Sequence, residues 1–467
     1  MEKPHTQTIL TVSGISLVLA IGGSCFLFWK AHSQQAVWQQ WTQQLSTADL
    51  WQGNAAPPEL TQQAQRLQTQ LVKNNMQTPG VASLARAVQG RQALEQRALA
   101  ITLVQKETGA AVYSGSILLS QHPTWVHDSG TAVSANFTVD PAMVERSLRQ
   151  GEIAGLPLLQ TSTVLSAQLD AKQVLRATAD GIAKPGYDID ISSAAAHIAD
   201  AFEKNIPSLT LQGTYSEPSV TVQKPDGSTQ TLQLLATGLS DFAGSTPGRL
   251  WNVHKAIEQQ IHNVMVKDGT VFSLVAALNA PITLGKGWKE DLGLFGGGAA
   301  MTPGAGICQS ATTLYRAALL AGLPIVEKRN HSLYVSHYEL FGIGLDATVF
   351  PNVHDFRFQN NTGGDLLIQA YTQGDTVIVH MFGKKDGRSV SLDGPYFFNS
   401  KKRPVALRAL GRNEIGWVRT LTDADGSHQT QPLIATYAKP FPRSLTAKYG
   451  PRQSIKLLAE AVVPRNN

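Results

Sequence analysis

Cysteine is scarce in this sequence of 467 residues, which contains only Cys25 and Cys308. Two cysteines exclude a fold held together by several disulfides and a zinc site built mainly from thiolates. Charged residues make up 16% of the chain and hydrophobic residues 42%, so the chain is not mainly disordered. With 40 Gly and 23 Pro it is not a fibrous repeat either. At roughly 100–200 residues per domain, we expect two or three globular domains.

Positive charge is concentrated near the C-terminus. The net charge is +5, and the residues from Lys384 onward carry 15 Lys or Arg against 6 Asp or Glu. A basic region on a near-neutral body suggests an anionic surface nearby, such as lipid headgroups or a phosphate-rich wall polymer. An ordinary soluble domain rich in arginine is the alternative. We expect no nucleic-acid partner.

Ile9–Trp29 is a run of 21 residues without a charge. Its length predicts one transmembrane helix, with a short cytoplasmic head before it and the bulk of the chain extracytoplasmic. A cleaved signal peptide would end in a small-x-small site, whereas this run ends in Phe-Leu-Phe-Trp. Lipidation of Cys25 is a further alternative, but the preceding Gly22-Gly23-Ser24 lacks the aliphatic residue expected there. We therefore predict a single-pass membrane anchor over residues 1–30.

The rest of the chain predicts an α+β protein in four parts. Residues 31–109 are Gln-rich and have a helical pattern, which indicates a stalk or a packing helix. Residues 110–240 show strand–cap–helix units that begin at Asp140, Asp170 and near Asp190, which is typical of an α+β binding or spacer module. Residues 246–383 predict a mixed α/β domain, and residues 384–467 a small β-rich region.

Cys308 follows a Gly-Ala-Gly-Ile loop and precedes a helical pattern that Gly322 and Pro324 end. At a helix start, free N–H groups and the helix dipole favour a thiolate and can hold the oxyanion of an acyl intermediate. Cys308 is therefore a candidate nucleophile for acyl transfer. A buried structural cysteine is the alternative.

A cysteine nucleophile needs a base, and His331 lies after the predicted helix and a short strand. His337 would share a face with His331 if a strand began there, because six is an even spacing. Asp346 is a candidate to orient the imidazole. Together with Cys308 these groups would also make four zinc ligands, but no recognised zinc spacing supports such a site. We expect no metal or other cofactor, and we interpret His354 and His380 as structural.

The segment GAGICQSATTLYRAALLAGLPIVEKRNHS resembles the signature of the VanW domain family. The resemblance extends over residues 246–383, through Thr246-Pro247-Gly248-Arg249 with Asn252, Asp346-Ala347-Thr348 and the stretch from Asp355 to Thr362. Residues 110–240 more loosely resemble the peptidoglycan-binding module that often precedes VanW. Three departures stand out: Ala305 in place of a glycine, Ser310-Ala311 in place of Val-Ser, and a longer stretch between His331 and Asp346.

The resemblance implies work on the cell wall, because members of this family are recognised as L,D-transpeptidases with a cysteine nucleophile. It assigns the nucleophile to Cys308 and the motif histidine to His331, and it matches Asp346 to the family's aspartate. Further candidates, for binding substrate or oxyanion, are Gly304, Gly306, Gln309, Asn330 and Ser332.

The function expected from these residues is the formation of 3-3 peptidoglycan cross-links through a cysteine acyl-enzyme. The partners would then be peptidoglycan stem peptides and glycan, together with the cytoplasmic membrane. A cell-wall cysteine peptidase or amidase is one alternative. A non-catalytic peptidoglycan-binding accessory protein of the glycopeptide-resistance type is another.

Overall fold

The computed structural model describes residues 80–128, 137–224, 227–295 and 298–441, with a few more between 62 and 73. The predicted membrane span Ile9–Trp29 and the chain after residue 441 lie outside the described residues. Within the described ranges, no helix is long and apolar enough to cross a membrane. The described chain is mixed α+β, with many short strands and few helices, and it divides into two compact units.

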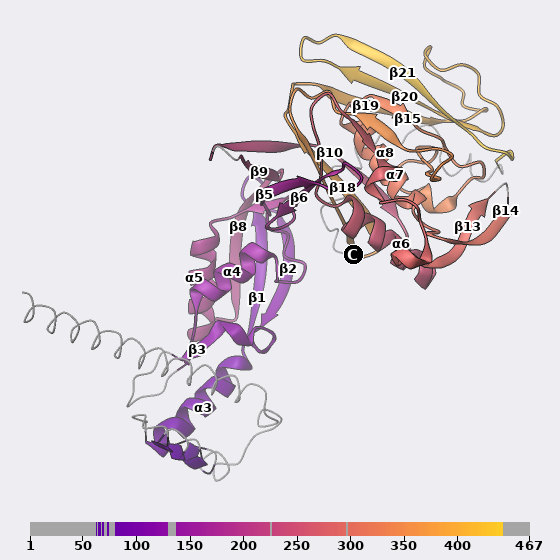
Figure 1. Ribbon diagram of the computed structural model, residues 1–467. Helices are drawn as coiled ribbons and strands as arrows, with labels where there is room; N and C mark the ends of the chain where they lie inside the picture. Colours follow the sequence, from indigo (N-terminus) through magenta and orange to yellow (C-terminus); the bar gives the residue numbers. More distant parts are fainter. Residues whose placement is uncertain are drawn as a thin grey trace, which may run out of the picture. The chain divides into compact units, whose positions relative to one another are not determined.

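The first unit runs to Leu156 and also contains Ile189–Gly213. Its sheet has the order β2-β1-β8, in which β1 is antiparallel to β2 and parallel to β8. The elements of this unit are α3 (Val81–Glu95), β1 (Ala98–Gln105), β2 (Ala111–Leu118), β3 (Val126–Asp128), β4 (Phe137–Val139), α4 (Pro141–Gln150), α5 (Ile191–Glu203) and β8 (Ser208–Ser216). The helices α4 and α5 pack against each other beside the sheet (Figure 1).

Two of the three predicted helix caps are confirmed. The side chain of Asp140 accepts a hydrogen bond from the Ala142 N–H at the start of α4, and Asp190 accepts one from Ser193 at the start of α5. The helix expected after Asp170 is wrong. Asp170 instead closes a turn between two antiparallel barrel strands, because its carboxylate accepts hydrogen bonds from the N–H groups of Lys172 and Val174.

The prediction that residues 31–109 are helical is wrong at its end. The helix α3 stops at Glu95, and β1 begins at Ala98. Leu99, Ile101 and Leu103 are buried while the residues between them are more exposed, which is the two-residue period of a strand. The alternation of apolar residues therefore makes this segment a strand and not a continuation of α3.

The second unit contains residues 157–188 and the chain from Thr214 onward, and its centre is a closed barrel. The strand order around the barrel is β10-β18-β17-β11-β6-β5-β9. The bounds are β5 (Ser162–Leu169), β6 (Leu175–Ala179), β9 (Ser219–Gln223), β10 (Thr229–Asp241), β11 (Val264–Val266), β17 (Leu366–Gln373) and β18 (Thr376–Gly383). Barrel strands thus come from both the 110–240 segment and the 246–383 segment, so the compact units differ from the expected domain boundaries.

Smaller elements of the second unit surround this barrel. They are β7 (Gly186–Asp188), α6 (Pro247–His254), a π-helical turn (Lys255–Ile261), β12 (Val271–Ser273), α7 (Leu274–Ala277), β13 (Glu290–Phe295), β14 (Gly298–Pro303), α8 (Cys308–Leu320), β15 (Ile325–Glu327), β16 (Arg357–Gln359), β19 (Ser389–Tyr396), β20 (Glu414–Thr422) and β21 (His428–Thr436). The last three strands form one antiparallel sheet, which agrees with a β-rich C-terminal region.

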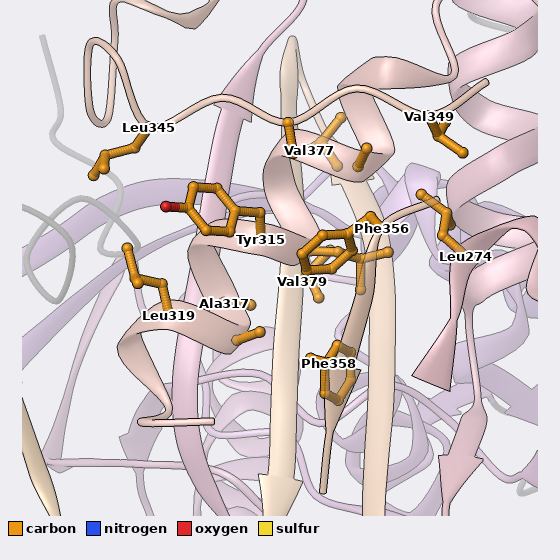
Figure 2. Packing of buried hydrophobic residues seen from close by; sticks show 14 of the residues in the cluster. Leu274, Tyr315, Ala317, Leu319, Leu345, Val349, Phe356, Phe358, Val377 and Val379 are labelled. Carbon is orange, nitrogen blue, oxygen red and sulfur yellow. The ribbon is translucent and has the colours of Figure 1, made fainter. Parts of the chain in front are cut away.

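The helix α8 lies on the barrel strands β10 and β18 and is buried almost all round. Tyr315 of α8 meets Phe356 edge to face, with ring centroids 6.0 Å apart, and Figure 2 shows Val379 beside them in the same core. The predicted end of this helix is confirmed, because Gly322 adopts φ +77 and the Leu323 N–H turns back to the Ala318 carbonyl. The barrel therefore holds α8, and with it Cys308, in a fixed position.

The close approach of α8 to β10 depends on Gly238. A Cβ atom at this position would lie 2.2 Å from the Thr313 carbonyl oxygen and 2.7 Å from the Ala317 nitrogen. We expect Gly238→Ala to lower the free energy of unfolding by about 3 kcal/mol, because backbone atoms must move apart. Urea denaturation measures the change. Gly285→Ala is the control, since a Cβ there meets nothing within 4 Å, and equal stability of the two variants would contradict the packing argument.

The C-terminal sheet is part of the same core and not an appendage. Trp417 of β20 is buried and donates a hydrogen bond from Nε1 to the Ile343 carbonyl at 2.8 Å. Phe397, Ile415 and Tyr437 belong to the hydrophobic cluster that contains α8. In Figure 1 this sheet, coloured orange to yellow, lies beside α8. Residues after 383 therefore complete the domain that carries Cys308.

Arg316, in the middle of α8, is a fully buried cation. Its guanidinium donates hydrogen bonds to five backbone carbonyls, those of Leu239, Tyr338, Leu340, Gly342 and Leu345. Four of these acceptors lie in one segment, which wraps around the guanidinium. The prediction of a strand from His331 to His337 is therefore wrong. Residues 336–338 form a 3₁₀ turn, and the backbone carbonyls from Tyr338 onward accept hydrogen bonds from Arg316 instead of from a neighbouring strand.

Candidate active site

Cys308 is the first residue of α8, as the sequence predicts, and its side chain is partly exposed. The loop before it contains Gly304 at φ +79 and Gly306 at φ +108, values that favour glycine. A Cβ on Gly304 would also lie 2.3 Å from Ile282. Ala305, which replaces a family glycine, does not adopt a positive φ, so the replacement causes no backbone strain. Asn252 holds the loop, since its Nδ2 donates to the Ala305 carbonyl at 2.9 Å.

The fold places His331 between Asp346 and Cys308. Nδ1 of His331 donates to Oδ2 of Asp346 at 2.6 Å, and the His331 backbone N–H donates to the same oxygen at 2.8 Å. The imidazole also acts on the Cys308 thiol through hydrogen bonding and charge, while Sγ itself donates to the Val349 carbonyl at 3.6 Å. The arrangement is the one that orients a base toward a cysteine.

The electrostatics of this series favour an ion pair between thiolate and imidazolium. Burial alone would lower the pKa of His331, but its bonds with Asp346 and Cys308 raise that pKa to about 9. Burial alone would raise the pKa of Asp346, but the protonated imidazole holds it at about 2. Burial also opposes ionisation of Cys308, yet the hydrogen bond and charge of His331 lower the pKa of the thiol below its ordinary value.

Two backbone N–H groups beside the sulfur are available to a ligand. The N–H groups of Gly304, Ala305, Ile307 and Gln309 donate to backbone carbonyls. Those of Gly306 and Cys308 have no acceptor in the described part of the chain. These two groups are therefore the candidates for an oxyanion hole, and the N–H of Gly304, which donates to Lys289 at 3.0 Å, is not.

Three of the other predicted substrate-binding residues form hydrogen bonds within the fold. The Gln309 side chain is fully buried, where Nε2 donates to Ser240 and to the Asp241 carbonyl. Nδ2 of Asn330 donates to the carbonyls of His331 and Thr436, which ties the histidine to the C-terminal sheet. Ser332 is exposed, and its carbonyl accepts from the Ala438 N–H at 2.7 Å.

Three further histidines were considered in the sequence analysis. His337 lies on the 3₁₀ turn, where burial and then the charge of Arg249 lower its pKa. Nε2 of His354 lies 2.7 Å from the Thr348 hydroxyl. His380 is buried between the hydroxyls of Thr237 and Tyr371, and burial lowers its pKa to about 3. In the part of the chain that the structure describes, no group of three or more His, Cys, Asp or Glu side chains is arranged to hold a metal.

Two tyrosines and one arginine at this site were not assigned from the sequence. The Tyr437 hydroxyl donates to Oδ1 of Asp346 at 2.6 Å, and the ring of Tyr338 lies 5.2 Å from that of His331. Arg249 contacts the loop before Cys308. Arg249 belongs to the Thr-Pro-Gly-Arg motif, so the sequence could have indicated it as a site residue. No local pattern links Tyr437 to Asp346, which lies 91 positions away.

The bond from Tyr437 to Asp346 yields a stability prediction. We expect Tyr437→Phe to lower the free energy of unfolding by about 1–3 kcal/mol, because it leaves a buried carboxylate oxygen without its donor. Thermal denaturation measures the loss. Tyr396→Phe is the matched control, since its hydroxyl donates at 2.7 Å to Asp393, whose exposed carboxylate water can reach. Equal losses in both variants would show that burial of the acceptor does not matter.

A partly exposed cysteine at a helix start, with a histidine and a buried aspartate in series, is the side-chain set of cysteine nucleophiles that transfer acyl groups. These three residues lie within residues 248–382, which match the family model described as VanW like protein, so this part of the chain is a VanW-like domain.

A curated relative supports the same assignment. The chain is 32% identical over 153 residues to a protein of Bacillus subtilis (strain 168) described as "Uncharacterized protein YoaR". The match covers 32% of this chain and 48% of the relative, so the chain spans about half the length of the curated relative it matches. No solved structure matches the chain.

Proposed function

We propose that the protein is a membrane-anchored L,D-transpeptidase that forms 3-3 cross-links in peptidoglycan outside the cell membrane. The observation that carries the proposal is His331, which contacts the Cys308 thiol on one side and Asp346 on the other, next to the unused N–H groups of Gly306 and Cys308. A non-catalytic binding domain has no need of a lowered thiol pKa or of N–H groups left open beside the sulfur.

In the proposed acylation step, the Cys308 thiolate attacks the carbonyl carbon of the third residue of a donor tetrapeptide. The oxyanion that forms accepts hydrogen bonds from the N–H groups of Gly306 and Cys308. The His331 imidazolium gives its proton to the amide nitrogen, the C–N bond breaks and D-Ala leaves. Cys308 then carries the tripeptide as a thioester, and Asp346 holds the imidazole in place throughout.

In the proposed transfer step, the side-chain amine of an acceptor stem attacks the thioester carbonyl. His331 takes the proton that the amine loses, the new amide bond forms and the thiolate leaves. If water attacks instead, the product is a shortened stem peptide, and the enzyme acts as a peptidase. The residues 1–30 would hold the enzyme at the membrane, and the module around residues 110–240 would bind glycan or stem peptide.

The proposal is tested by the intact mass of the full-length protein in detergent after incubation with a tetrapeptide-bearing muropeptide. We expect a mass increase equal to the tripeptide acyl group, and no increase with Cys308→Ala. Addition of an acceptor stem should then yield cross-linked dimers. The absence of an adduct in the folded wild-type protein, together with a Cys308 that iodoacetamide cannot alkylate, would contradict the proposal and favour a binding protein.

A further inference from the structure

Arg249, on α6, lies beside the loop that carries the nucleophile. Its Cγ is 3.0 Å from the position that a Cβ on Gly306 would occupy, and its Nη2 donates to Oε1 of Gln309 at 2.9 Å. Arg249 thus contacts Gly306, two residues before Cys308, through its Cγ, and Gln309, the residue after Cys308, through its guanidinium. Its positive charge is among the influences that lower the pKa of Cys308.

The partners of this guanidinium are all neutral. Nε donates to the Ser245 hydroxyl at 3.2 Å, Nη2 donates to the Gln309 amide, and the phenol of Tyr338 also hydrogen-bonds Arg249. In the described residues no carboxylate forms an ion pair with the guanidinium of Arg249. Asp291 accepts from the Arg249 backbone N–H and is near enough for the charge of Arg249 to help lower the pKa of its carboxyl. Since an arginine has five N–H donors, at least two of them are available.

A partly buried guanidinium that forms no ion pair is costly to maintain, and an anionic ligand reduces that cost. Each contact of Arg249 fixes the guanidinium in place without neutralising it. The side chain is therefore preorganised for an anion that arrives with the substrate. A carboxylate suits a planar guanidinium, which binds it through two parallel hydrogen bonds.

We infer that Arg249 binds the C-terminal carboxylate of the donor peptide, on the residue that leaves when Cys308 is acylated. This inference rests on the proposed function. In a donor that ends one residue past the attacked carbonyl, only the amide nitrogen and one Cα separate that carbonyl from the carboxylate. The two groups are thus close enough to reach the thiol and the guanidinium together, and Arg249 selects peptides that end at this residue.

The inference is tested by calorimetric titration of the full-length Cys308→Ala protein in detergent, which binds without reacting. The probes are a stem tetrapeptide with a free C-terminal carboxylate and the same peptide as a C-terminal amide. We expect the amide to bind about 10- to 100-fold more weakly, the range for a lost charge-assisted hydrogen bond. Adding Arg249→Gln should weaken binding of the acid to the level of the amide, whereas Arg403→Gln, at an exposed arginine outside both the site and the 110–240 module, should not.

The inference would be overturned if the protein with Arg249 intact bound the acid and the amide equally well. It would also be overturned if that protein bound neither peptide. The comparison of peptides needs no change at Arg249, so it remains decisive even if Arg249→Gln fails to fold. Acylation of the wild-type protein is a separate readout. Equal acylation by both peptides would overturn the role of Arg249 alone, while selective binding of the acid without a thioester would overturn the transpeptidase function alone.

Discussion

Asp346→Asn is expected to slow acylation of Cys308 by about 10³-fold or more, as loss of the acid does in other nucleophile–histidine–aspartate sites. The carboxylate accepts two hydrogen bonds from His331, one from Nδ1 and one from the backbone N–H. An asparagine cannot stabilise the imidazolium and can present its amide group to Nδ1, which selects the wrong tautomer. The measurement is the rate at which the mass adduct forms with the donor muropeptide.

The same substitution should move the pH dependence of the reaction. In the wild-type protein His331 keeps its proton up to its pKa of about 9, so acylation should decline only as the pH rises through that value. Without the carboxylate the pKa of His331 falls toward its ordinary value of 6.5, and the decline should begin near neutral pH. The absorbance of the thiolate near 240 nm should move the opposite way and appear at higher pH than in the wild-type protein, because a less basic imidazole stabilises the Cys308 thiolate less.

The sign of the linked stability change follows from the raised pKa of His331. Its protonated form stabilises the fold fully below pH 6.5, and this contribution is lost as the pH rises through about 9. The lowered pKa of Asp346 acts at the other end, with a contribution present above 3.8 and lost as the pH falls to about 2. Asp346→Asn should flatten both dependences in urea denaturation.

Asp170→Asn is the matched control for these experiments. Asp170 is also a hydrogen-bonded carboxylate in the second unit, where it accepts from the N–H groups of Lys172 and Val174 in the β5–β6 turn. We expect it to leave the acylation rate and its pH dependence unchanged. A comparable slowing in both variants, or no slowing with Asp346→Asn, would show that the carboxylate does not act through His331.

Arg316→Met should be the most destabilising single substitution among those considered, with a loss on the order of 5 kcal/mol of unfolding free energy or failure to fold. Methionine fills a similar volume but donates no hydrogen bond, so five buried carbonyls lose their donor at once. The segment from Tyr338 to Leu345 ends next to Asp346. Its release should therefore also disturb the position of the carboxylate, which the acylation rate detects.

Two comparisons isolate the cause of this loss. Arg316→Lys keeps the charge and some of the hydrogen bonds, and we expect a smaller loss of stability. Arg149→Met makes the same change on α4, where the arginine is exposed and paired with Glu145, and should change stability by less than about 0.5 kcal/mol. A stable, fully active Arg316→Met protein would show that the fold does not need the buried cation.

Features that depend on neighbouring residues could be predicted from the sequence. The start of α8 at Cys308, its end before Gly322 and the caps at Asp140 and Asp190 are confirmed, because each depends on a few consecutive residues. The contact between His331 and Cys308 also involves a short separation, bridged by one helix and one strand. Predictions from local pattern were wrong after Asp170, where a helix was expected, and between His331 and His337, where a strand was expected. In both places the conformation depends on contacts that the local pattern does not show.

Other features arise only in the tertiary structure. The barrel pairs β6 with β11 and β5 with β9, strands that are well separated in sequence, and no local period shows that they will meet. Tyr437 reaches Asp346 because β21 ends beside it, and Arg249 meets Gln309 because α6 packs next to the Gly306 loop. The sequence by itself determined which thiol stands at a helix start, since capping and helical period are short-range. The surroundings that ionise the thiol were decided by the tertiary structure, because burial and charge act between residues that only folding brings together.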